Sequence, residues 1–142
     1  MSQPAAFRRE MDLVTMQVVD WEGPIVEILF HRPLATAADV AELLRETRSF
    51  MEETVVAAGK AKSYFVTCYD HFSVPREVAH ALQEAFLEFN RQYSKGDVRY
   101  GGTLVAKTLV ISTAIRSESS SELYATRDEA LASLRARHRA AR

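Results

Sequence analysis

Residues 63–75 of the chain are Ser-Tyr-Phe-Val-Thr-Cys-Tyr-Asp-His-Phe-Ser-Val-Pro. The first seven are rich in β-branched and aromatic residues and carry no charge, which predicts a central strand that is covered on both faces. Turn formers and a proline follow. Apolar residues then recur at helical spacing, at Val78, Leu82, Ala85, Phe86, Phe89 and Tyr93. Residues 62–93 are therefore predicted to form a strand, a polar turn and an amphipathic helix.

The polar turn at residues 70–75 is the first place where we expect function. In open α/β sheets, ligands and partners meet the protein just past the carboxyl ends of the strands. This turn directly follows the predicted central strand, so it should lie at that end of the sheet.

Length, charge and cysteine content exclude several classes of protein. A chain of 142 residues with 47% hydrophobic residues is expected to form one domain with its own core. Its net charge of -1 gives no global electrostatic reason to expect nucleic acid as a partner. Cys68 is the only cysteine, which excludes an internal disulfide and multi-cysteine zinc sites. We expect no cofactor and no metal.

The sequence also contains no membrane-targeting pattern. No window approaches the roughly 18 uninterrupted apolar residues that suggest a membrane span. No apolar segment of signal-peptide length follows the first ten residues. A cytoplasmic protein is therefore expected.

Upstream of the central strand, the pattern predicts a hairpin and a long helix. Residues 11–21 and 25–30 are apolar and are separated by Glu-Gly-Pro, which is typical of two strands joined by a turn. Thr36 with Asp39 three residues later resembles a capping box, with aspartate in place of the usual Glu or Gln. The helix that it opens should end near Gly59.

Downstream of the second helix, which Ser-Lys-Gly at residues 94–96 should end, the pattern is harder to interpret. Residues 97–105 predict a strand that is interrupted by two glycines. Residues 107–116 fit a strand by their β-branched content and a short helix by their spacing, so both remain open. Residues 123–125 predict a short extended segment, and Thr126 with Glu129 forms a capping box for a last helix.

The element order predicts an α/β fold, β-β-α-β-α-β-(α)-β-α. Strands that alternate with helices imply a mostly parallel sheet with helices packed against it, and the first strand should be antiparallel at or near an edge. We expect a flexible N-terminus at residues 1–10, a single domain at residues 11–139 and a C-terminal tail at residues 140–142.

This order resembles the bacterial STAS-like domains, the anti-sigma-factor-antagonist class. The early hairpin, Tyr-Asp-His-Phe at residues 69–72 and Leu-Tyr-Ala-Thr-Arg-Asp-Glu-Ala-Leu-Ala-Ser-Leu at residues 123–134 carry the resemblance, which spans nearly the whole chain. It implies a helix at residues 107–116. It also implies a non-enzymatic regulatory domain that binds a kinase-like or anti-sigma-like protein near the start of its second helix.

The residues around that helix start form the predicted partner-binding or regulatory site. They are Asp70, His71, Phe72, Ser73, Arg76 and Glu77. In STAS switches, the phosphorylated Ser or Thr directly follows the aspartate. Ser73 departs from that pattern and is interpreted first as a turn residue, with Val74 as the helix cap and Pro75 as the first helical residue.

A second polar group stands at the end of the second predicted strand. If the strands are parallel neighbours, His31 and Arg32 would meet Asp70 and His71 at one rim, as an anion or ligand site. A carboxylate, two imidazoles and a guanidinium can also perform acid–base chemistry. An uncharacterised enzyme is therefore a lesser alternative, although no nucleophile–base pair, and hence no catalytic residue, can be named.

A carrier or sensor of a small apolar ligand, such as a lipid, is the main alternative. Phe50, Phe65, Phe86, Phe89 and Tyr93 fall on predicted core faces. The same side chains would line an apolar pocket, but a filled core is the default. A homodimer through a strand edge or helix face is a further hypothesis without specific support.

Overall fold

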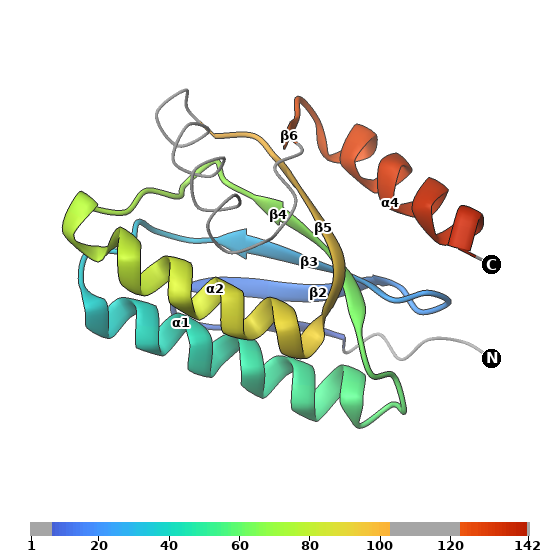
Figure 1. Cartoon of the computed structure of the whole chain (residues 1–142), viewed down its shortest axis with the longest axis horizontal. Helices are drawn as coiled ribbons and strands as arrows, with labels where there is room; N and C mark the ends of the chain where they lie inside the picture. Colours follow the sequence, from blue (N-terminus) through green and yellow to red (C-terminus); the bar gives the residue numbers. More distant parts are fainter. Residues whose placement is uncertain (1–6, 103–122, 142) are drawn as a thin grey trace.

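The structure is a computed structural model that describes residues 7–102 and 123–141. Within these residues the chain forms an α/β fold around a six-stranded sheet with the order β1-β2-β3-β4-β5-β6 (Figure 1). The strands are β1 (Arg8–Glu10), β2 (Val14–Asp20), β3 (Ile25–Phe30), β4 (Ser63–Cys68), β5 (Ser94–Tyr100) and β6 (Leu123–Tyr124).

The sheet is mixed. The four strands from β3 to β6 are parallel, whereas β1 pairs antiparallel with β2, and β2 pairs antiparallel with β3. The predicted hairpin and parallel centre are therefore confirmed, but the sheet has a further antiparallel strand. Residues 8–10, expected in a flexible terminus, form this edge strand. These residues, Arg-Arg-Glu, are polar and lack the hydrophobic alternation from which a strand is predicted. Cross-strand pairing with β2 holds them in the sheet.

The first long helix begins as predicted. In α1 (Ala37–Phe50), Thr36 Oγ1 accepts the Asp39 N–H at 3.2 Å, while the Asp39 carboxylate accepts the Thr36 N–H at 3.3 Å. The helix continues as a π-helical segment, Met51–Val56. Helical hydrogen bonding ends around Gly59, whose φ is +86°.

The second helix begins later than expected. A 3₁₀ turn, Arg76–Val78, leads into α2 (Ala79–Tyr93). Pro75, predicted as the first helical residue, instead occupies the cap position with ψ of 150°. Its ring fixes φ but leaves ψ free to be extended, so the helical turn starts one residue further on. α2 ends at Tyr93 as predicted, and Ser94 already belongs to β5.

The last helix, α4 (Arg127–Ala141), begins at its predicted cap, where Thr126 Oγ1 accepts the Glu129 N–H at 3.2 Å. Ala140 and Ala141, expected in a tail, belong to this helix. The alternatives for residues 107–116 lie outside the described residues.

The two faces of the sheet support separate cores. α1 and α2 lie side by side on one face, over Val26 and Phe65, whereas α4 covers the other face, over Tyr64 and Val66 (Figure 1). Each residue of β4 is buried, as predicted for a strand that is covered on both sides. Among the described helices, none combines the length and the apolar composition that crossing a membrane requires.

Candidate functional site

Residues 70–77 are attached to neighbouring segments at two points, through the Asp70 side chain and the Ser73 backbone. Asp70 Oδ1 accepts the N–H of Gly102 at 2.9 Å, and the carbonyl of Ser73 accepts the N–H of Leu34 at 2.8 Å. A Cβ at Gly101, where φ is +72°, would collide with the Asp70 carboxylate, so a glycine is needed for this close approach. We call residues 70–77 the pinned loop.

A buried aromatic ring anchors the pinned loop from within. Phe72 is 5% exposed, and its ring centroid lies 4.8 Å from that of Phe30 and 4.6 Å from that of Tyr69. Phe72 was predicted among the partner-binding residues. The structure places it in the core, where it fixes the loop from below.

The other predicted side chains of the pinned loop face solvent. Asp70, His71, Ser73, Arg76 and Glu77 are all exposed. The Gly102 N–H, followed by the Cys68 thiol, lowers the pKa of Asp70, so this carboxylate is ionised at neutral pH. The loop thus combines a fixed backbone with an exposed surface of both charge signs.

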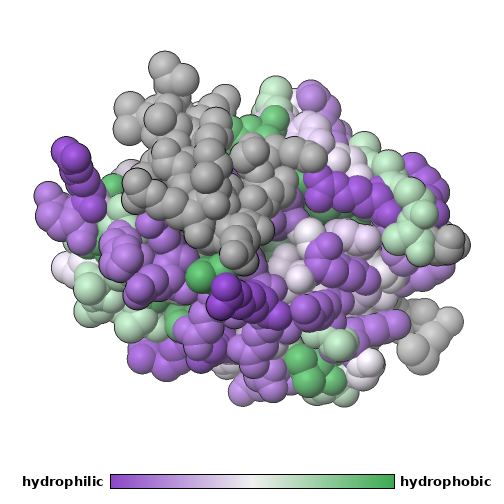
Figure 2. Space-filling view, viewed as in Figure 1, coloured by the Kyte–Doolittle hydropathy of each residue, from purple (hydrophilic) through white to green (hydrophobic). Residues whose placement is uncertain are grey.

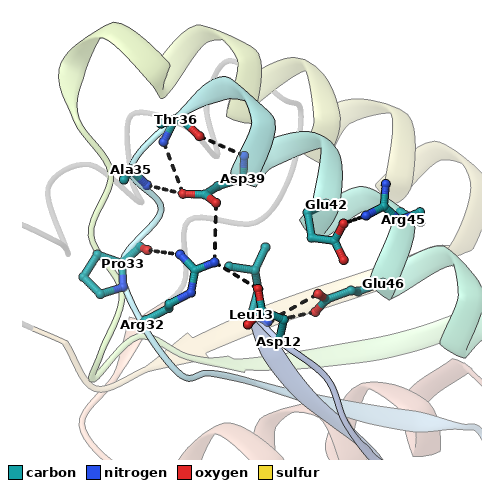
Figure 3. Close-up of polar contacts among 10 residues, drawn as sticks. All are labelled: Asp12, Leu13, Arg32, Pro33, Ala35, Thr36, Asp39, Glu42, Arg45 and Glu46. Atoms are coloured by element: carbon teal, nitrogen blue, oxygen red, sulfur yellow. Dashed lines mark hydrogen bonds and ion pairs between the residues drawn. The ribbon is translucent and has the colours of Figure 1, made fainter.

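His31 and Arg32 make other contacts. The His31 ring is hydrogen-bonded to Thr15 Oγ1. Arg32 Nη2 lies 3.0 Å from Asp12 and 3.5 Å from the capping residue Asp39 (Figure 3). Within the described residues, these two side chains make no hydrogen bond or ion pair with the pinned loop.

β3 and β4 are parallel neighbours with Leu29 opposite Cys68, so the residues that follow them lie at the same edge of the sheet. Within the described residues, however, no hydrogen bond or ion pair joins His31 or Arg32 to Asp70 or His71. Figure 3 shows that the Arg32 guanidinium joins Asp12, just before β2, to Asp39 at the start of α1. It also shows the Glu46 carboxylate, which accepts the Leu13 N–H at 3.0 Å. Arg32 is paired locally with Asp12 and Asp39, and its role as part of an anion or ligand rim stays a prediction.

A second polar cluster was missed from the sequence. Glu27, 1% exposed, accepts hydrogen bonds from Gln17 Nε2 at 2.6 Å, from the Tyr100 hydroxyl at 2.7 Å and from Arg127 Nε at 2.8 Å. The cluster links β2, β3, β5 and α4. The available signal was the single charge inside Ile-Val-Glu-Ile-Leu-Phe, since a charge in a buried strand needs partners.

The electrostatics of this cluster indicate a stabilising role. Burial alone would raise the pKa of Glu27, but the donors from Arg127, Tyr100 and Gln17 lower it below its usual value. Burial, followed by the hydrogen bond to Glu27, raises the pKa of Tyr100. Glu27 is therefore an ionised acceptor with a lowered pKa that is held by three donors, and it is poorly suited to abstract a proton.

Cys68 lies next to the start of the pinned loop and is a buried free thiol. Burial raises the pKa of this thiol, so it is not a thiolate at neutral pH. Across the described residues, no group of histidine, cysteine and carboxylate side chains is arranged to hold a metal ion.

The apolar space beneath α1 and α2 is small. The pocket between these helices and the sheet, which is lined by residues such as Phe30 and Phe89, has a volume of about 30 Å³. That is room for about one water molecule. The predicted core residues Phe50, Phe65, Phe89 and Tyr93 are buried, and Phe86 is partly buried.

Comparison with known proteins assigns no family and no relative to this chain. No protein-family model matches this chain, and no curated protein matches its sequence.

Proposed function

We propose that the chain is a non-enzymatic, STAS-like regulatory domain that binds a protein partner through the pinned loop and the start of α2. The pinned backbone of residues 70–77 is the observation that carries this proposal. Because its backbone is already fixed by Asp70, Ser73 and Phe72, the loop would lose little conformational entropy on binding.

The charges of the loop are available to a partner. Within the described residues, the side chains of Arg76 and Glu77 make no ion pair or hydrogen bond. His71 is exposed beside them and can donate or accept. A partner with complementary charges would gain orientation and association rate from these groups.

The rest of the described surface offers little apolar area. Val56, at 38% exposure, is the exposed large apolar residue among the described residues. Figure 2 shows a mainly hydrophilic surface where α1 and α2 lie. A polar, charge-matched interface therefore fits this chain better than a large hydrophobic one.

The small apolar pocket favours protein binding over lipid carriage. Ligand pockets usually measure about 300–1,000 Å³. The space of about 30 Å³ under α1 and α2 is far below that range. A lipid carrier would need a large rearrangement of α1 and α2 on this face, whereas partner binding at the pinned loop needs no rearrangement.

Phosphorylation is not needed for this proposal. Ser73 is exposed, but the acidic residues Asp70 and Glu77 lie within four positions of it in the sequence. Like charges so placed oppose the modified state. Partner binding by the unmodified loop is the simpler mechanism.

Affinity capture from lysate of the source organism tests the proposal. The tagged chain is compared with a charge-swapped variant, Arg76→Glu with Glu77→Lys, which keeps the net charge. The matched control is the swap of the ion pair Glu42–Arg45 on α1, as Glu42→Lys with Arg45→Glu.

We expect a stoichiometric partner with the wild-type chain and the control, and its loss with the loop swap. Recovery of the same partner by both variants would contradict binding at the loop. Failure of the wild-type chain to recover a partner, together with a retained small molecule in its intact mass, would favour the carrier.

A further inference from the structure

A pocket of about 330 Å³ lies at the opposite end of the sheet from the pinned loop. It is formed by the turn between β2 and β3 and by the last turns of α4. The pinned loop follows the carboxyl end of β4, whereas this pocket lies at the start of the parallel strand β3. The two surfaces are therefore separate, and the pocket has no part in the proposed partner binding.

One part of the pocket wall is aromatic and aliphatic, and the rest is charged. Trp21 is half-buried, and its ring stands edge-on to Phe7 with centroids 4.4 Å apart. Ile25 is buried beside it. The ring of His138 lies against Gly23, where any Cβ would collide with it. A planar body can be accommodated between such surfaces.

The charged residues at the pocket differ in how they are paired. Asp20 is bound by Arg135, with Nε 2.9 Å and Nη2 3.4 Å from its carboxylate oxygens. Arg139 also lines the pocket and is exposed, and within the described part of the chain it makes no ion pair or hydrogen bond. One guanidinium is therefore left for a ligand.

His138 contributes the surface of its ring to the pocket. Its Nε2 atom is buried against Gly23 and has no hydrogen-bond partner within the described residues, so this atom is not accessible to a ligand in the pocket.

We propose that this pocket binds a small organic carboxylate with a planar apolar body. The body would lie among Trp21, Ile25 and the His138 ring, and the carboxylate would bind the guanidinium of Arg139. A guanidinium fork matches a carboxylate in two parallel hydrogen bonds. A monoanion is favoured over a phosphate dianion because the carboxylates of Asp20 and Glu22 also line the pocket.

Trp21 supplies the readout, because it is the only tryptophan in the chain and gives one indole N–H resonance. The ¹⁵N-labelled chain is titrated with benzoate, with its neutral analogue benzamide and with inorganic phosphate. We expect a saturable shift of the Trp21 resonance with benzoate and weaker responses to the other two probes.

Two single-site variants complete the test. Arg139→Ala should weaken benzoate binding by about tenfold, the usual scale for one charge-assisted contact. Arg76→Ala, in the pinned loop, is the matched control and should leave benzoate binding unchanged. The absence of a saturable shift, equal affinity for benzamide, or unchanged affinity in Arg139→Ala would each overturn the proposal.

Discussion

Replacing Glu27 by glutamine should destabilise the fold by about 2–3 kcal/mol, although the two side chains are nearly the same size. The wild-type carboxylate accepts three hydrogen bonds, from Gln17, Tyr100 and Arg127. A glutamine retains one acceptor oxygen but turns an N–H₂ group toward a donor. The substitution thus removes the charge and leaves at least one donor without an acceptor.

The three donors do not lose the same hydrogen-bond energy in this variant. Tyr100 is 8% exposed, so water does not readily replace its acceptor, whereas the Arg127 side chain is 42% exposed and can be rehydrated. A hydrogen bond to a charged group contributes about 1.5–3 kcal/mol. Tyr100 and Arg127 both donate to Oε2, where the amide oxygen of glutamine can remain, whereas Gln17 Nε2 donates to Oε1 and would face the N–H₂ group. One bond lost at Gln17, together with the weakening of the bonds from Tyr100 and Arg127 when the charge is removed, gives the stated range.

Urea unfolding of the wild-type chain and of Glu27→Gln measures this difference. The midpoint should fall while the m-value stays the same, since both proteins expose the same surface on unfolding. Glu77→Gln, at an exposed site of the pinned loop, is the control and should stay within about 0.5 kcal/mol of wild type. A Glu27→Gln value inside that same margin would refute the assignment of Glu27 as a structural acceptor.

Three further predictions use the same unfolding measurement. The folded-state pKa of Glu27 lies below its usual 4.5, so the stability that this carboxylate contributes should be lost as pH falls through that lower pKa. The free energies of unfolding of wild type and Glu27→Gln should therefore converge at low pH. A difference between them that does not change with pH would contradict this. Phe72→Ala should cost about 3–5 kcal/mol because it empties a buried site, whereas the exposed neighbour His71→Ala should change stability by less than about 0.5 kcal/mol; equal losses would refute the anchoring role. Thr36→Ala should cost about 1 kcal/mol by removing the cap of α1, and an unchanged midpoint would show that the cap is dispensable.

Features set by neighbouring residues could be predicted from the sequence. The cap of α1 depends on Thr36 and on a residue three positions later, and the cap of α4 has the same spacing at Thr126. The central strand was predicted because seven consecutive residues carry no charge, and all of β4 is buried. The position of the pinned loop followed from that strand.

Features set by long-range pairing could not be predicted. β1 is polar, and only its register against residues 15–17 makes it a strand. Glu27 is joined to Arg127, 100 positions later in the chain, and periodicity contains no such information. Arg32 was placed at a rim because it follows a strand, and its ion pairs with Asp12 and Asp39 could not be read from the local pattern.

The most direct measurement for the proposed function is hydrogen–deuterium exchange of the chain with and without its captured partner. The amides of residues 70–77 and of the first turn of α2 should become protected, while those of the β2–β3 turn at residues 20–24 should exchange as before. Protection confined to any other surface, or no change at residues 70–77, would contradict the claim that the pinned loop is the binding site.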